Sequence, residues 1–148
     1  MKTLTIGDLK ARIPIIQGGM GVGISLSGLA SAVANEGGIG VISAAGLGLL
    51  YKKLSPSNYT EAGNLGLAEE IRKAREKAKG IIGVNVMVAL SDFAELVKTS
   101  IAEKVDIIFS GAGLPLDLPS FLKKDSVTKL VPIVSSARAV RIICAKWK

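Results

Sequence analysis

The chain has 148 residues, of which 49% are hydrophobic and 21% are charged, so we expect a single globular domain over residues 1–148 and exclude an intrinsically disordered chain. Its formal net charge is +7 at pH 7, but the basic residues fall on expected helix faces and only 4% of residues are aromatic, which disfavours a nucleic-acid partner. The sequence has no histidine and one cysteine, Cys144, so it offers no Ser-His or Cys-His nucleophile pair, no internal disulfide and no cluster that suggests a metal.

Five apolar runs in the chain each end on a polar but uncharged residue with small residues beside it. These runs, which we predict to be β-strands, cover residues 13–17, 39–43, 81–86, 105–110 and 129–135. Their polar positions are Gln17, Ser43, Asn85, Ser110 and Ser135, which lie 26, 42, 25 and 25 residues apart. This spacing is typical of strand–helix units whose strands are parallel, and strands so rich in Ile, Val and Leu are typical of sheets covered on both faces. We therefore predict an α/β fold.

Helical patterns fill most of the intervals between the predicted strands. The first helix, about 26–36, has Ser25 or Ser27 as a candidate cap. Later helices are expected at 66–79, at 92–103 with Ser91 as its cap, at 117–124, and from Ala137 onward. Residues 46–66 interrupt the rhythm, and two interpretations stay open for them: a lid or contact surface, or a plain surface loop.

The polar groups at the predicted strand ends do not ionise at neutral pH. Parallel strands bring their carboxyl ends to one face, so these groups would form a ring of neutral hydrogen-bond donors and acceptors. Such a ring suits a neutral ligand with amide-like edges, and the isoalloxazine ring of a flavin is one. Gly18 and Gly19 would let backbone N–H groups approach this ligand, and Met20 could pack on a ring face. Taken singly, each serine could instead be a local cap, and Met20 could fill the core.

The glycine-rich segment after the first strand also invites comparison with a dinucleotide-binding Rossmann turn. Its glycines alternate at Gly19, Gly21 and Gly23, and Leu26 stands where that fingerprint requires its third glycine. No acidic residue ends the second predicted strand. Both features disfavour the Rossmann interpretation.

Residues 13–21 (IPIIQGGMG) and 29–43 (LASAVANEGGIGVIS) strongly resemble the opening of the nitronate monooxygenase family, formerly called 2-nitropropane dioxygenases. Residues 83–85, 110–115 and 131–136 are similar to later strand ends of the same family. The resemblance implies an FMN-binding (β/α)8 TIM barrel, of which about five parallel β/α units are present here. A complete barrel takes about 250 residues. We therefore expect the chain to be the amino-terminal portion of such a barrel, truncated within the helix after strand five.

The resemblance also implies roles for individual residues. Those expected to contact FMN or to lie beside its ring or the substrate are Gln17, Gly18, Gly19, Met20, Ser43, Asn85, Ser110, Gly111 and Ser135. The family's catalytic histidine lies in an Ala-Gly-Gly-His stretch that these 148 residues do not contain. No catalytic residue is therefore assigned.

The activity that the resemblance implies most directly is oxidative denitrification of alkyl nitronates with O2. Since the catalytic half of the barrel is missing from these residues, we expect the 148-residue chain alone to be inactive. A second interpretation is the NAD(P)H-dependent enoyl-acyl-carrier-protein reductase of the same family. A third, from another class, is a non-catalytic flavin-binding or interaction module. The expected partners are a small-molecule substrate (a nitronate or an enoyl thioester) with O2 or NAD(P)H, and possible pairing as a homodimer. We expect a cytoplasmic location, because the single cysteine fits a reducing compartment. We expect no membrane partner, since no apolar run reaches the length that spans a bilayer.

Overall fold

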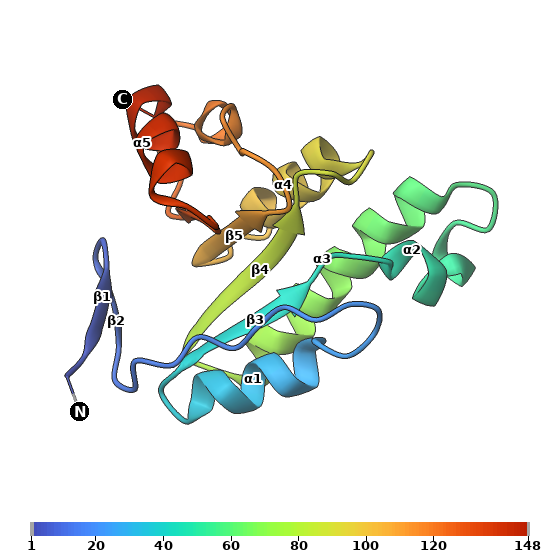
Figure 1. Cartoon of the computed structure of the whole chain (residues 1–148). Coiled ribbons are helices and arrows are strands. Elements are labelled where there is room, and N and C mark those ends of the chain that lie inside the picture. Colours follow the sequence, from blue (N-terminus) through green and yellow to red (C-terminus); the bar gives the residue numbers. More distant parts are fainter. Residues whose placement is uncertain (1, 148) are drawn as a thin grey trace.

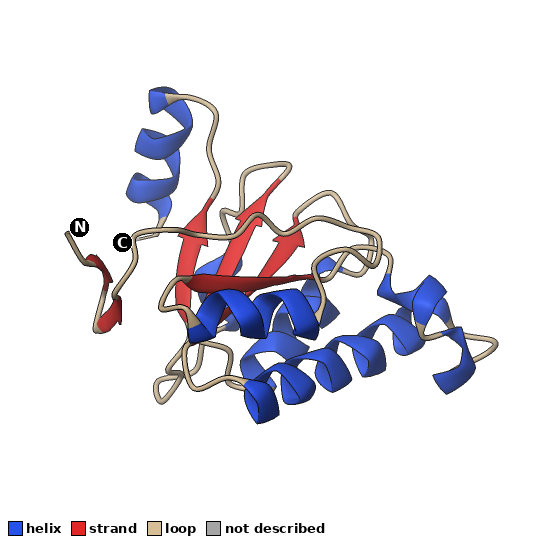
Figure 2. Ribbon diagram, turned by 90° about the horizontal axis from the view of Figure 1, so that it is seen from below, coloured by secondary structure: helices blue, strands red, loops and turns tan. Residues whose placement is uncertain are grey.

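Four parallel strands form an open sheet in the order β3–β4–β5–β6 in a computed structural model that describes residues 2–147. The strands are β3 (Ile39–Ser43), β4 (Ile81–Met87), β5 (Ile107–Gly111) and β6 (Lys129–Pro132). Figure 2 shows them side by side with their helices. The predicted α/β class and partial (β/α)8 barrel are confirmed.

Three helices cover one face of this sheet (Figures 1 and 2). They are α1 (Ser27–Asn35), α3 (Tyr59–Lys77) and α4 (Phe93–Ala102). Alternate residues of each strand point to this face, because side chains alternate across a pleated strand. Together with the helices they form the larger core, which includes Ile42, Val84, Val86, Ile108, Leu67, Ile71, Leu96 and Val97.

The opposite face of the sheet carries a smaller core that includes an unpredicted amino-terminal hairpin. The hairpin consists of β1 (Leu4–Ile6) and β2 (Leu9–Ala11), which pair antiparallel. Its side chains pack against the strand residues Ile39, Val41, Ile107 and Phe109. Alternation in segments of three residues is too short to distinguish a strand from a loop, which is why the sequence pattern did not indicate the hairpin.

The predicted first strand, 13–17, is only partly correct. It lies beside β3 in the parallel direction, with one bridge between Ile16 and Ile39, and Gln17 N–H donates to the Ile39 carbonyl at 3.0 Å. Pro14 has no N–H to add to a ladder, and the chain turns away after Gln17. The segment therefore flanks the sheet without forming a regular strand.

The segment 46–66 is packed structure, which corrects the expectation of an insertion loop followed by a helix at 66. It contains α2 (Leu47–Leu50) and a short 3-10 turn, η1 (Lys52–Leu54), and α3 begins seven residues earlier than predicted, at Tyr59. A Cβ atom on Gly48 would come closer than 3.0 Å to Tyr59. Glycine at this position therefore lets α2 lie directly against α3.

Several predicted helix ends also differ. Neither Ser25 nor Ser27 caps α1, whose N-cap is Leu26, and the residue before α4 is Asp92 rather than Ser91. The expected helix at 117–124 is a short 3-10 turn, η2 (Leu118–Phe121). The last helix, α5 (Ala137–Lys146), begins where predicted and stands clear of the sheet in Figure 2. None of the helices within residues 2–147 has the length and apolar character needed to cross a membrane.

Candidate functional site

The carboxyl ends of β3 and β4 bring two of the predicted polar residues together. Ser43 pairs in register with Asn85, and Asn85 pairs with Phe109 of β5. Ser43 is buried and Asn85 is half-buried. Because side chains in register on neighbouring strands point to the same face, Ser43 and Asn85 form one polar patch, which we call the strand-end site.

The glycine-rich loop, residues 18–24, passes directly over the strand-end site. A Cβ atom on Gly19 would come closer than 3.0 Å to the Asn85 side chain, and one on Gly21 would lie 3.3 Å from Ser43 Oγ. A residue with a side chain would push the loop away from the sheet. The alternating glycines therefore serve close approach of the loop to the strand ends, and each of these two covers a different strand.

Gln17 lies at the start of this loop, and its side-chain amide is already paired with β3. The Val41 N–H donates to Gln17 Oε1 at 3.1 Å, and Gln17 Nε2 donates to the Val41 carbonyl at 3.0 Å and to Ser25 Oγ at 2.9 Å. These bonds take the place of the backbone pairing that a fifth strand would make. The structure thus places Gln17 beside the site, with its amide directed at the sheet.

Gly18 and Met20 are on the open side of the loop. A Cβ atom on Gly18 would meet nothing within 4 Å, and 58% of Met20 is exposed. Ile15, Val22 and Ile24 nearby in the chain are also exposed. This combination of a polar strand-end patch and exposed apolar side chains suits a flat, largely neutral ligand.

The predicted residues on β5 divide between the two faces of the sheet. Ser110 pairs with Val86, a residue of the larger core, and is fully buried on the helix-covered face. Its Oγ is the one fully buried side-chain polar atom among residues 2–147 that has no hydrogen-bond partner. Gly111 follows on the other face, where a Cβ atom would come within 2.9 Å of Ile133. The structure therefore separates Ser110 from Ser43 and Asn85.

Ser135 lies beyond the end of β6, in a hollow of about 320 Å³. Residues from two segments line this hollow: Ala112, Gly113, Leu114, Ile133, Val134, Ser135 and Ala139. Gly113 has a φ of +145°, a conformation that favours glycine. The hollow is mostly apolar and follows the carboxyl ends of β5 and β6, on the same side of the sheet as the strand-end site.

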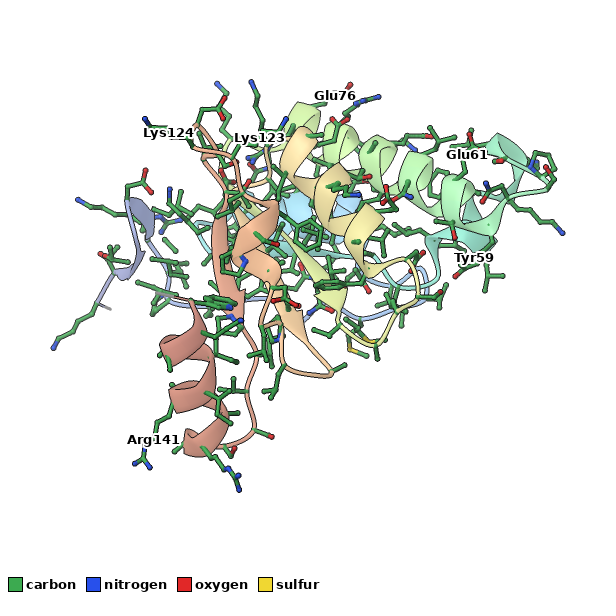
Figure 3. All side chains as sticks on the ribbon, turned by 90° about the horizontal axis from the view of Figure 1, so that it is seen from above. Tyr59, Glu61, Glu76, Lys123, Lys124 and Arg141 are labelled. Carbon is green, nitrogen blue, oxygen red and sulfur yellow. The ribbon has the colours of Figure 1, made fainter. Side chains whose placement is uncertain are left out.

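A larger hollow of about 750 Å³ lies at the other end of the strands. Its lining includes Lys104 and Val127, which come shortly before β5 and β6, together with Lys98, Phe121 and Lys123. It is therefore remote from the strand-end site. Figure 3 shows Lys123 and Lys124 at the edge of the molecule in this region and Arg141 on the outer side of α5.

The strand-end site carries no ionisable side chain, so its chemistry is hydrogen bonding and contact. The nearest buried carboxylate is Glu70 of α3, which accepts the Ser27 N–H at 2.6 Å at the start of α1 and also the Tyr51 hydroxyl. Burial raises the pKa of Glu70, but the hydrogen bonds from Tyr51 and Ser27 outweigh it and hold the pKa below its usual value. No group of three potential metal ligands occurs among the residues that the structure describes.

Ser25 is the residue of this region that the sequence pattern assigned incorrectly. It is 1% exposed, and its Oγ accepts from Met20 N–H at 2.9 Å and from Gln17 Nε2, and donates to the Gly18 carbonyl at 3.1 Å. The short spacing from Gln17 is compatible with such a closed loop. The sequence alone could not distinguish this loop-closing role of Ser25 from the role of a helix cap.

Comparison with known proteins identifies the family. A sequence model described as "Nitronate monooxygenase" matches residues 2–148. The chain belongs to the nitronate monooxygenase family. This confirms the resemblance noted from the sequence, and the enzymes of this family are flavin-dependent oxidoreductases that use FMN.

Solved structures agree with this assignment. FabK from Thermotoga maritima is 28% identical with a TM-score of 0.68, over 90% of this chain and 37% of that one. Its M276A mutant is 31% identical with a TM-score of 0.71, over 90% of this chain and 39% of that one. A nitroalkane oxidase from Streptomyces ansochromogenes shares the fold, with a TM-score of 0.72 at 17% identity, over 92% of this chain and 44% of that one. The chain thus spans about two fifths of these proteins, and a search of curated proteins found no match.

Proposed function

We propose that residues 1–148 are the amino-terminal part of an FMN-dependent oxidoreductase barrel, and that the strand-end site holds one edge of the flavin ring. The observation that most supports this proposal is the pairing of the Gln17 side-chain amide with the backbone of Val41. The Gln17 side chain occupies the polar groups of Val41, and the backbone N–H groups of Gly18 and Gly19 donate no hydrogen bond within residues 2–147. Gly19 lies beside Asn85 at the carboxyl ends of the strands, and Gly18 precedes it on the open side of the loop.

The residues present fit the ring of FMN. The ring offers alternating N–H and C=O groups, and the site offers the Asn85 amide, the Ser43 hydroxyl and two backbone N–H groups. Exposed Met20 supplies an apolar contact for a ring face. All these groups are uncharged, so the site would bind the ring, and the phosphate would be held by other residues of the protein.

We propose nitronate monooxygenase activity as the leading specific function. FMN would supply the redox chemistry between an alkyl nitronate and O2. Within this chain, Asn85, Ser43 and the loop 18–24 would orient the ring, and the packed loop would exclude water from one of its edges. The chain has no histidine, so it contributes no group of that type for proton transfer.

The NAD(P)H-dependent enoyl-acyl-carrier-protein reductase is the second candidate. The sequence identity to FabK and its mutant, 28% and 31%, exceeds the 17% identity to the nitroalkane oxidase. This difference supports the reductase as a second candidate function. Either activity uses a small-molecule substrate. Pairing as a homodimer stays a prediction.

Two assays on the protein loaded with FMN separate these functions. Consumption of O2 with an alkyl nitronate, without NAD(P)H, is the expected result for the leading proposal. Oxidation of NAD(P)H that depends on an enoyl thioester would instead establish the second candidate. Both assays require the whole barrel, because residues 1–148 lack the family's histidine. FMN binding with neither activity in that whole protein would overturn both proposals and favour a non-catalytic flavin-binding module.

A further inference from the structure

We propose that Ser25 is a positioning residue that holds the loop 18–24 in its ligand-ready shape, an inference that rests on the proposed flavin site. The loop has no regular secondary structure between Gln17 and α1, although it lies in close contact with Asn85. Something other than a helix or sheet ladder must therefore fix its backbone. The contacts of Ser25 meet this need.

Ser25 closes the loop by binding both backbone groups of Met20. The Ser25 N–H donates to the Met20 carbonyl at 2.9 Å, and Ser25 Oγ accepts from the Met20 N–H at 2.9 Å. The same Oγ donates to the Gly18 carbonyl at 3.1 Å. Both backbone groups of Met20 and the carbonyl of Gly18 are thus satisfied, whereas the N–H groups of Gly18 and Gly19 donate to no group within residues 2–147.

Ser25 also fastens the closed loop to the sheet at two points. The Ser43 N–H donates to the Ser25 carbonyl at 2.8 Å, and the Gln17 amide, itself paired with Val41, donates to Ser25 Oγ at 2.9 Å. Every polar group of Ser25 is therefore used, and the residue is only 1% exposed. It would act on a ligand only through the loop.

The matched test compares Ser25→Ala with Ser100→Ala. Ser100 is equally buried, and its Oγ makes a single bond to the Leu96 carbonyl within α4. Ser25→Thr keeps the hydroxyl and is the conservative variant. Two readouts on the 148-residue chain are used: amide hydrogen exchange of residues 18–24 without FMN, and FMN affinity by titration.

Within residues 18–24 the Met20 N–H is the one with a hydrogen-bond acceptor, Ser25 Oγ, so Ser25→Ala should speed exchange of the Met20 amide by about tenfold or more while β4 and β5 keep wild-type exchange. Its dissociation constant for FMN should rise by about tenfold or more, since a binding-competent loop shape becomes less populated. Ser100→Ala should change neither readout, and Ser25→Thr should restore both toward wild type.

Wild-type exchange in the loop of Ser25→Ala would overturn the positioning role. Faster exchange spread evenly over the whole chain, or equal effects in Ser100→Ala, would overturn it as well, because these results describe general destabilisation. Failure of the wild-type chain to bind FMN would overturn the proposed function instead. The exchange readout would still decide whether Ser25 holds the loop.

Discussion

Glu70 shows how one buried carboxylate can replace a missing helix cap. Leu26 occupies the N-cap position of α1 and has no side-chain acceptor, so the first N–H groups of the helix need another partner. Glu70, 4% exposed on α3, accepts the Ser27 N–H and the Tyr51 hydroxyl. One residue thus joins α1, α3 and the segment after α2.

The lowered pKa of Glu70 predicts a pH-dependent contribution to stability. Since the folded-state pKa lies below the unfolded one, the contribution is complete above the unfolded value and is lost as the pH falls through the folded value. Glu70→Gln should lower the free energy of unfolding by about 1 kcal/mol at neutral pH. It should also flatten the fall in stability between about pH 5 and pH 3.

Urea unfolding of Glu70→Gln and wild type across this pH range would measure the effect. Glu69→Gln is the control, because Glu69 is a half-exposed neighbour paired with Lys73 and exposed pairs contribute little. Equal pH profiles for Glu70→Gln and wild type would contradict the assignment of Glu70 as the cap.

Gly18 and Gly19 are adjacent, and the structure predicts opposite outcomes for them. Gly19→Ala would force its Cβ against Asn85, so we expect a loss of about 1–3 kcal/mol in the free energy of unfolding or a displaced loop. Gly18→Ala meets open space and should be nearly neutral. Thermal unfolding of both variants would check this, and equal stability of the two would show that the loop does not lie on Asn85.

At the scale of elements, α3 carries the main departure from the sequence pattern. The helix expected at 66–79 is present, but it begins at Tyr59, directly after Ser55, Pro56, Ser57 and Asn58, which are residue types typical of a turn. Asn58 is part of that turn and also the N-cap, since its side chain accepts the Glu61 N–H at 3.0 Å. The local signal for a turn and the signal for a helix start use the same residue types.

Asn58→Ala should therefore destabilise the start of α3. Loss of an N-cap bond typically costs about 1 kcal/mol. Ser57→Ala, at the exposed position just before it, is the matched control and should have almost no effect. Circular dichroism with urea unfolding would measure both variants. A fully stable Asn58→Ala variant would contradict the helix start at Tyr59.

The strands and the polar residues were predicted with different success, for a physical reason. β3, β4, β5 and the start of β6 were found because long apolar runs are a strong signal. The face to which a strand-end residue points depends on register within one residue, and a shift of one reverses it. Ser43 and Asn85 share a face, whereas Ser110 points to the helices, and no composition or spacing could show that difference.

The hydrogen-bond partners of Gln17 and Ser25 could not be predicted from the sequence, for a different reason. Both were expected from local rules, as a ligand contact and as a helix cap. The bonds described above join residues 5 to 24 positions apart, and the longest, from Gln17 to Val41, depend on the return of the chain along β3. Such pairing is set by tertiary packing, which a local pattern does not encode.

In the molecule as a whole, the two faces of the sheet are covered by different parts of the chain. The helix-covered face holds the larger core, and the other face is packed by the hairpin near one end and by the glycine-rich loop near the other. Figure 1 shows the hairpin to one side of the sheet and the segment that follows it running along β3. The ligand-facing end is thereby left with polar strand ends and exposed apolar residues.

Titration of the 148-residue chain with FMN, followed by quenching of the flavin fluorescence, tests the central claim most directly. We expect saturable binding of one FMN, weakened by about tenfold or more in Asn85→Ala, because that amide is placed to bond the ring. Lys123→Ala, at the remote hollow, should bind as wild type does. Absence of saturable binding, or equal affinity of Asn85→Ala and wild type, would contradict a flavin site at the ends of β3 and β4.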